Sequence, residues 1–172
     1  DGSSNSMRIR WLSDAQNVLL EDCKMSHGVS NIIFAAGSGY RMTNIAIRRC
    51  IIVDAYSAGQ GHSQGLYAAG VDGLLIEENV LDHNGWNEDV DGADRTIFNH
   101  NMYLQNGSTN VTVRGNISTR ASSHGLQFRP GGLAENNLFM RNALAMFNTS
   151  NRGVTRNNVV LQSDDISETL PR

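Results

Sequence analysis

Two short segments of the chain carry histidine, glutamine, tyrosine and arginine among apolar residues, and these side chains could together perform acid–base chemistry. Residues 100–105 (HNMYLQ) contain His100, Tyr103 and Gln105, and residues 122–132 (SSHGLQFRPGG) contain His124, Gln127 and Arg129. A histidine takes a proton near neutral pH, a tyrosine gives or takes one, and an arginine fork binds a carboxylate through two hydrogen bonds. The combination matches β-elimination on a uronate-containing glycan, which needs a neutralised carboxylate, a base and an acid.

The three tasks divide among the residue types. Arg129 suits neutralisation of the uronate carboxylate, because its guanidinium can pair with both oxygens. His100 or His124 suits removal of the proton next to that carboxylate. Tyr103 suits protonation of the leaving oxygen, or acts as both base and acid. We predict these four as the catalytic residues, a set that resembles the one used by several alginate lyases of a different fold.

These side chains can act together only if the fold places their segments side by side, and a repeat in the sequence predicts such a fold. Six segments of alternating or short apolar character end on Cys23, Cys50, Asn79, Asn116, Asn137 and Asn158, at spacings of 27, 29, 37, 21 and 21 residues. Repeats in this range of lengths are typical of solenoids. Asparagines stacked at one turn can form a ladder of side-chain amides.

Two further strand-like elements accompany these segments. One lies at residues 31–37, 64–70, 101–107, 125–131 and 143–149, and a shorter one lies at residues 51–53, 80–82, 117–119, 138–140 and 159–161. Three strands per coil, stacked in parallel, form a triangular prism in which each coil buries its inward residues on its neighbours. We therefore predict an all-β solenoid of about six coils.

The repeat resembles that of the right-handed parallel β-helix proteins of the pectate-lyase-like superfamily, over residues 8–162. The resemblance implies a polysaccharide-active protein, although the superfamily includes lyases, hydrolases, epimerases and phage tailspikes. We expect one β-helix domain over residues 1–172 in a secreted protein, extracellular or periplasmic. Open solenoid ends expose strand edges. Because no amphipathic capping helix is evident, we expect a segment of a longer β-helix or a domain capped by neighbouring chains.

The resemblance also indicates which face holds the cleft, since the strand with the longest preceding loops lines it in such proteins. Alternation along residues 64–70, 101–107, 125–131 and 143–149 then points Leu66, Met102, Leu126, Leu144 and Met146 inward and Ala145 and Phe147 outward. Stacking predicts three outward columns: Gln64, His100 and His124; Tyr67, Tyr103 and Gln127; and Ala69, Gln105 and Arg129. We predict substrate binding by His62, Gln64, Tyr67, Trp86, Gln105 and Gln127.

The longest insertion, residues 83–96 (HNGWNEDVDGADRT), immediately precedes the segment of His100 and should form a wall beside it. Its Asp89, Asp91 and Asp94 are spaced as in a short calcium loop, but His100 stands where the bidentate glutamate belongs. Ca²⁺ at these aspartates is the one cofactor considered, and a solvated turn is the alternative.

Other functions remain open. A glycoside hydrolase needs a pair of carboxyl groups, and the acidic residues nearest the cleft are Glu88 and the three aspartates of the loop. A uronate C5-epimerase would share the proton abstraction. A non-catalytic carbohydrate-binding or structural β-helix, like a tailspike or adhesin, would present aromatic platforms such as Tyr67, Trp86 and Phe147.

Composition narrows the partners. The net charge is −3 and the arginines are scattered, so the chain is no polybasic nucleic-acid binder. No apolar run reaches the roughly 18 residues of a membrane span. We expect a polysaccharide substrate, and neither nucleic acid nor a membrane as a partner.

Overall fold

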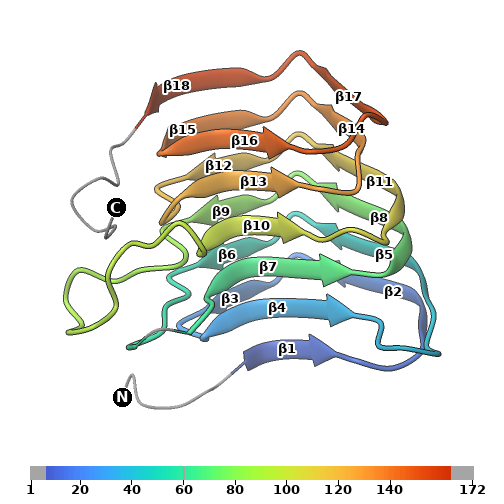
Figure 1. Cartoon of the computed structure of the whole chain (residues 1–172), viewed down its shortest axis with the longest axis horizontal. Helices are drawn as coiled ribbons and strands as arrows, with labels where there is room; N and C mark the ends of the chain where they lie inside the picture. Colours follow the sequence, from blue (N-terminus) through green and yellow to red (C-terminus); the bar gives the residue numbers. More distant parts are fainter. Residues whose placement is uncertain (1–6, 60, 164–172) are drawn as a thin grey trace.

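The chain winds into a stack of coils with three parallel β-sheets, one on each side of a prism (Figure 1). The computed structural model describes residues 7–59 and 61–163. Sheet A contains β1 (Met7–Trp11), β4 (Ser30–Ala35), β7 (Gln64–Ala69), β10 (His100–Leu104), β13 (His124–Phe128) and β16 (Leu144–Asn148). Sheet B contains β2 (Ala15–Glu21), β5 (Met42–Arg48), β8 (Val71–Glu77), β11 (Thr109–Arg114), β14 (Gly132–Glu135) and β17 (Gly153–Arg156). Sheet C contains β3 (Lys24–Ser26), β6 (Ile51–Val53), β9 (Val80–Asp82), β12 (Ile117–Thr119), β15 (Leu138–Asn142) and β18 (Val159–Ser163).

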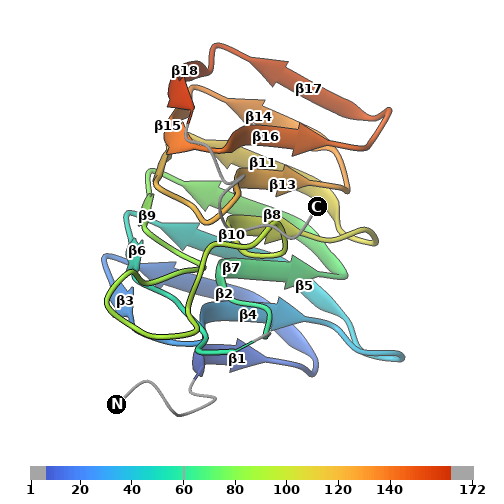
Figure 2. The ribbon, with the colours of Figure 1, turned by 60° about the vertical axis from the view of Figure 1, so that its left-hand side comes forward.

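The predicted all-β parallel β-helix with three strands per coil and about six coils is confirmed, since each of the three sheets has six strands. Two strands, β1 and β3, were not among the predicted elements. The described part of the chain has no helix. The long connection between β9 and β10 projects from the side of the stack (Figures 1 and 2).

The predicted asparagine ladder forms at the corner between sheets B and C. Each asparagine side-chain oxygen accepts from the preceding coil: Asn79 accepts from the backbone N–H of Cys50, Asn116 from Asn79, Asn137 from Asn116, and Asn158 from Asn137, all at 2.9–3.0 Å. The amide nitrogens of Asn79 and Asn116 donate to Ile47 and Ile76 carbonyls. The ladder thus satisfies polar groups that are buried where the chain turns.

A second asparagine ladder, which was not predicted, lies at the corner that leads into sheet A. Nδ2 of Asn31 donates to Oδ1 of Asn84, and Nδ2 of Asn84 donates to Oδ1 of Asn101 at 2.8 Å. Asn101 donates in turn to Ser118 Oγ. All three asparagines are fully buried. Asn101 and Met102 are successive residues, and both point into the interior. The alternation of inward and outward side chains in β10 therefore begins at Met102, and His100, which precedes Asn101, faces outward.

Sheet B carries a column of alternating charges at its carboxyl end. The paired positions are Glu21, Arg48, Glu77, Arg114, Glu135 and Arg156, in the order of the coils. Glu77, which is 7% exposed, lies 2.6 Å from Arg48 and 2.5 Å from Arg114. Burial alone would raise the pKa of Glu77, but its two arginine neighbours hold that pKa below the ordinary value. Each member of the column therefore favours one register with the next coil.

The inward residues form one continuous core along the prism. Leu66, Met102, Leu126 and Phe128 are 0% exposed, as predicted. In the last strand of sheet A the predicted directions of Met146 and Phe147 are confirmed, but that of Leu144 was wrong, because Leu144 pairs with His124 rather than Leu126 and is 42% exposed. Ala145, predicted outward, packs against the core with Met146. The corner shifts the alternation by one residue, which the sequence pattern alone did not indicate.

Candidate functional site

The strand register of sheet A brings the predicted residues of separate coils into columns. His100 pairs with Gln64 on one side and His124 on the other. Tyr103 pairs with Tyr67 and Gln127 in the same two strands. Adjacent strands lie about 4.8 Å apart, so side chains from three coils share one face. The first two columns predicted from the repeat are those observed, and in the third Arg129 contacts Gln105 at 3.4 Å.

Two neighbouring pockets open on this face. One, of about 370 Å³, is lined by Ser30, Ile33, His62, Gln64, Tyr67, Tyr103 and Gln105. The other, of about 440 Å³, is lined by His62, Ile97, Phe98, His100, Tyr103, His124, Gln127, Arg129, Leu144 and Phe147. Neither pocket has an aspartate or glutamate among its described lining residues. Arg129 is therefore the charged group of the pair of pockets, and the cleft is suited to an anion.

His100 is held rigidly and is only 2% exposed. Its backbone N–H donates to Oε1 of Gln64 at 2.8 Å, and Gln64 donates to the carbonyl of Phe98. Nδ1 of the ring lies 3.0 Å from Ser123 Oγ and 3.0 Å from Nδ1 of His124. Burial, followed by electrostatic repulsion of a protonated ring by His124, His62 and Arg129, lowers the pKa of His100 to about 2. His100 is therefore neutral at physiological pH and lies mostly beneath the surface of the pocket.

His124 is neutral for similar reasons but reaches the pocket. It is 5% exposed, and its Nδ1 lies 2.6 Å from Ser123 Oγ. Burial and then the charge of Arg129 lower its pKa to about 4. Its ring lies 5.5 Å from that of Phe147. Nδ1 is engaged internally, and Nε2 has no hydrogen-bond partner among the described residues, so Nε2 is the atom that can meet a ligand.

Gln127 connects the histidine pair to Arg129. One orientation of its amide satisfies both neighbours: the nitrogen donates to Nε2 of His100 at 2.8 Å, and the oxygen accepts from Nε and one terminal nitrogen of Arg129 at 3.1 Å each. The other terminal nitrogen of Arg129 donates to Oε1 of Gln105 at 3.4 Å. No carboxylate of the described residues pairs with Arg129. Its charge is held in place by amides and remains uncompensated.

Tyr103 lies between these groups. Its hydroxyl accepts a hydrogen bond from Nε2 of Gln105 at 3.0 Å. The guanidinium carbon of Arg129 lies 5.1 Å from the ring centroid, a cation–π contact. The ring meets those of Tyr67 and His100 edge-on, at 5.3 and 5.2 Å. Tyr103 is thus the phenol closest to the cation, while no hydrogen bond joins it to a histidine within the part of the chain that the structure describes.

Two residues that sequence reasoning missed form a wall beside the cleft, directly after the predicted insertion, whereas residues 83–96 themselves are not among the described lining of the two pockets. Ile97 and Phe98 line the larger pocket, and Phe98 is 61% exposed. Ser123 Oγ lies 3.0 Å from the carbonyl of Ile97, and the ring of His62 meets Phe98 edge-on at 5.8 Å. The available sequence signal for this wall was the apolar pair Ile97 and Phe98, which stands just before β10 with its outward polar residues.

Trp86, predicted to bind substrate, is not brought to the cleft. It lines a separate hollow of the insertion, where its Nε1 donates to the carbonyl of Arg120 and Arg95 stacks on its ring at 3.9 Å. The ring of His83 meets the Trp86 ring edge-on at 4.5 Å. The two ring nitrogens of His83 contact Asp54 and Glu88. Trp86 therefore anchors the insertion to the prism.

The three loop aspartates do not form a metal centre in this arrangement. No group of three or more His, Cys, Asp or Glu side chains within residues 7–59 and 61–163 is placed to hold a metal ion. Asp89, Asp91 and Asp94 line the hollow of the loop itself. The structure thus gives the calcium prediction no support.

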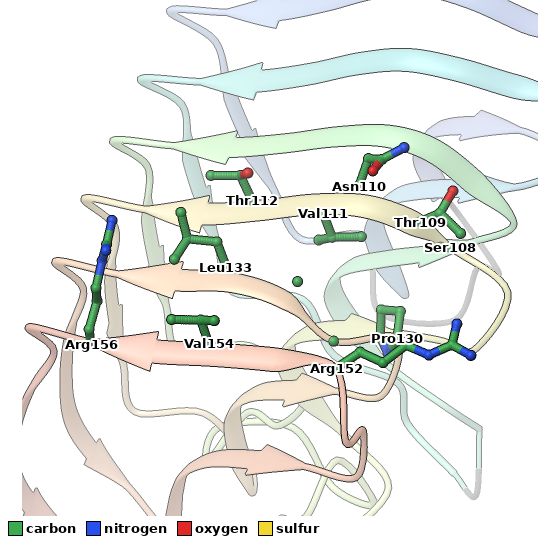
Figure 3. A pocket seen from close by; sticks show the side chains of 12 residues that line it. Ser108, Thr109, Asn110, Val111, Thr112, Pro130, Leu133, Arg152, Val154 and Arg156 are labelled. Carbon is green, nitrogen blue, oxygen red and sulfur yellow. The ribbon is translucent and has the colours of Figure 1, made fainter.

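A larger hollow, of about 760 Å³, lies over sheet B (Figure 3). Its lining comes from β11, β14 and β17 and from the segments that precede these strands. Arg152 and Arg156 lie at its opposite ends, and Thr112, Leu133 and Val154 lie between them. Arg156 is paired with Glu135 at 2.8 Å. The lining has no histidine, tyrosine or carboxylate among the described residues, so it lacks the acid–base groups of the sheet A pockets.

Comparison with known proteins agrees with this architecture. The family described as "Right handed beta helix region" matches residues 9–160, which is most of the chain. No curated protein and no solved structure gave a significant match. Within the described residues no helix is long and apolar enough to cross a membrane. The match indicates a polysaccharide-related or structural right-handed β-helix and does not extend to the pectate-lyase-like superfamily. On the match and the three parallel sheets together, the chain belongs to the right-handed beta helix region family.

Proposed function

We propose that the protein binds a uronate-containing polysaccharide across sheet A and cleaves it by β-elimination. One observation carries the proposal: the uncompensated guanidinium of Arg129 lies beside Tyr103 and a neutral histidine pair, in a cleft with no carboxylate among its described lining residues. An anionic sugar is attracted to such a site, and the proton next to its carboxylate becomes more acidic once that carboxylate is neutralised.

In the proposed reaction Arg129 pairs with the carboxylate of the uronate. The reaction starts from the tyrosinate form of Tyr103, whose phenolic proton has passed to solvent. The tyrosinate oxygen takes the proton from the neighbouring carbon, and the electron pair of that C–H bond becomes a carbon–carbon double bond. The glycosidic carbon–oxygen bond breaks, and the departing oxygen takes the proton from the Tyr103 hydroxyl, which returns Tyr103 to the tyrosinate. The hydrogen bond from Gln105 and the charge of Arg129 stabilise the negative charge of the tyrosinate oxygen.

Tyr103 is a better choice for this step than Tyr67 or His100. Burial, and then proximity to Tyr103, raise the pKa of Tyr67, so Tyr67 keeps its proton and serves as an aromatic wall. His100 has partners on both ring nitrogens and is 2% exposed. We therefore assign His100 a positioning role in place of the predicted base.

Hydrolysis and epimerisation fit the site less well. An inverting or retaining hydrolase needs two carboxyl groups at the scissile bond, and Glu88 instead contacts His83 at 2.8 Å in the insertion. An epimerase would use the same proton abstraction but would exchange solvent hydrogen into the sugar and form no double bond.

The test is to incubate the purified protein with a panel of uronate polysaccharides and to follow the ultraviolet absorbance of an unsaturated product. We expect a rise in absorbance that Tyr103→Phe abolishes and Arg129→Gln lowers at least 100-fold, while Tyr40→Phe, the same change outside the cleft, has no effect. Solvent hydrogen exchange without a rise would indicate an epimerase. An absorbance rise that Tyr103→Phe leaves intact would contradict the assigned mechanism.

A non-catalytic carbohydrate-binding module is the second candidate. It is favoured by Phe98 and Phe147, which are 61% and 43% exposed beside the pocket and could stack on sugar rings. The lack of a hydrogen bond between Tyr103 and either histidine also favours it. Measurable binding of an acidic glycan that Phe98→Ala weakens, without any unsaturated product, would support binding alone.

A further inference from the structure

The hydrogen bonds of the cleft form an ordered chain that begins at Arg129. A guanidinium only donates, so the side-chain oxygen of Gln127 must face it. The amide nitrogen of Gln127 then donates to Nε2 of His100 at 2.8 Å. A neutral imidazole that accepts at Nε2 carries its proton on Nδ1. The position of the Arg129 charge therefore fixes the tautomer of His100.

The tautomer of His100 fixes that of His124 in turn. The two Nδ1 atoms are 3.0 Å apart, and two N–H groups at that distance would place their hydrogens against each other. When the His100 proton on Nδ1 points at His124, Nδ1 of His124 accepts, either from His100 or from the hydroxyl of Ser123 at 2.6 Å, whose single proton then does not go to the carbonyl of Ile97 at 3.0 Å. The proton of a neutral His124 is then on Nε2, the nitrogen that has no internal partner.

We infer that Gln127 and His100 are positioning residues that hold His124 as a neutral N–H donor toward the pocket, where it and Arg129 together form a site for one carboxylate group. Arg129 supplies charge and His124 supplies a second directed hydrogen bond. His124 is thus a ligand for the anion and not the base. The identity of the anion as a uronate rests on the proposed function, whereas the order of the hydrogen bonds does not.

The surroundings favour a donor over a second cation at this position. Arg129, His100, His62 and Tyr103 are the titratable groups that share the described pocket lining with His124, and none is a carboxylic acid. A protonated His124 would place two positive charges side by side without a carboxylate in the described lining. A neutral N–H donor avoids this repulsion when the pocket is empty and still binds an oxygen.

Nitrogen-15 NMR of the histidine side chains tests the inference directly, because protonated and unprotonated ring nitrogens resonate at well separated positions. In the wild-type protein at pH 7 we expect His100 protonated on Nδ1 and His124 on Nε2. Gln127→Glu replaces the amide by a group that only accepts. In that variant we expect the proton of His100 on Nε2, which frees Nδ1 of His100 to accept and moves the proton of His124 to Nδ1.

Gln105→Glu is the matched control, since Gln105 also contacts Arg129 but touches neither histidine. It adds the same charge beside Arg129, and we expect both tautomers to stay as in the wild type. A wild-type His124 protonated on Nδ1 would overturn the inference even if no variant folds. Tautomers that do not change in folded Gln127→Glu would also overturn it.

Ligand binding separates this inference from the proposed function. A uronate oligosaccharide should shift the Nε2 resonance of His124, and its carboxyl-reduced neutral counterpart should not. We expect Gln127→Glu to weaken the affinity for the acidic oligosaccharide about tenfold or more, as for loss of one hydrogen bond to a charged group. If the oligosaccharide shifts Nε2 but no unsaturated product forms, the carboxylate site stands and the lyase proposal fails. If it binds without shifting Nε2, the assigned role of His124 is wrong.

Discussion

The two buried histidines predict a marked loss of stability in mild acid. His100 and His124 have pKa values of about 2 and about 4 in the folded chain, against an ordinary value of 6.5. Between pH 6.5 and 4 the unfolded chain therefore binds protons at both positions that the folded chain does not. Stability rises with pH wherever the unfolded state binds more protons, so the free energy of unfolding falls as the pH is lowered through this window.

The magnitude follows from the ordinary pKa. At pH 5 an unfolded histidine lies about 1.5 units below that pKa, and each unit corresponds to about 1.4 kcal/mol. Each buried neutral histidine then contributes a loss of about 2 kcal/mol between pH 7 and pH 5, or about 4 kcal/mol for both. Domains of this size unfold with about 5–15 kcal/mol, so the loss should be easy to measure.

Urea denaturation at pH 7 and pH 5 provides the assay, with wild type, His124→Gln and the double variant with His100→Gln. Each replacement should remove about 2 kcal/mol from the difference between the two pH values. For each protein we take the change in unfolding free energy from pH 7 to pH 5 and compare these changes between variants. The contributions of His27, His62 and His83 cancel in that comparison, because all variants share these residues. If wild type and His124→Gln lose the same free energy from pH 7 to pH 5, the reasoning is refuted, and this comparison requires only the single variant to fold.

Three further changes test the supports of the fold and site. Asn116→Ala should lower the free energy of unfolding by about 3 kcal/mol in urea titrations, because the buried N–H groups of Asn79 lose their acceptor. Asn151→Ala, at an exposed turn, should cost less than about 1 kcal/mol. Glu77→Gln should cost about 2–3 kcal/mol, since Arg48 and Arg114 lose their shared carboxylate, and a loss that 1 M salt leaves unchanged would be inconsistent with an electrostatic origin. Gly125→Ala should lower the free energy of unfolding by at least about 2 kcal/mol and abolish glycan binding. The added Cβ would lie 2.7 Å from the carbonyl of Ala145 and displace the adjacent His124. Unchanged binding would show that the backbone at this corner adapts to the larger residue.

The repeat made the fold predictable because a solenoid is specified by local pattern. The asparagines at one corner recur in register, so the coils and the outward columns of His100 and Tyr103 can be aligned from the sequence alone. The second ladder was missed because insertions separate Asn31 from Asn84 and Asn101 by unequal distances in sequence. At that corner two successive residues turn inward, and this reversed the predicted directions of Leu144 and Ala145.

The sequence predicted which residues form the candidate site better than it predicted what each of them does there. Strand pairing fixes which side chains are neighbours, so the grouping of His124 with Arg129 followed from register. The burial of His100 depends on how Gln64, Gln127 and Ser123 enclose it, which is a matter of three-dimensional packing. The position of Trp86 depends on the path of the insertion, and no periodic signal constrains such a path.

The alternating charges along sheet B also limit how such a chain can change its length. Because Glu21, Arg48, Glu77, Arg114, Glu135 and Arg156 succeed one another coil by coil, deletion of the coil that carries Glu77 would set Arg48 directly beside Arg114. Duplication of a single coil would likewise pair a residue with its own copy, and like charges in direct opposition are destabilising. Loss or gain of two coils keeps the alternation intact. The column therefore acts as a parity rule, under which this β-helix can lengthen or shorten in pairs of coils more readily than one at a time.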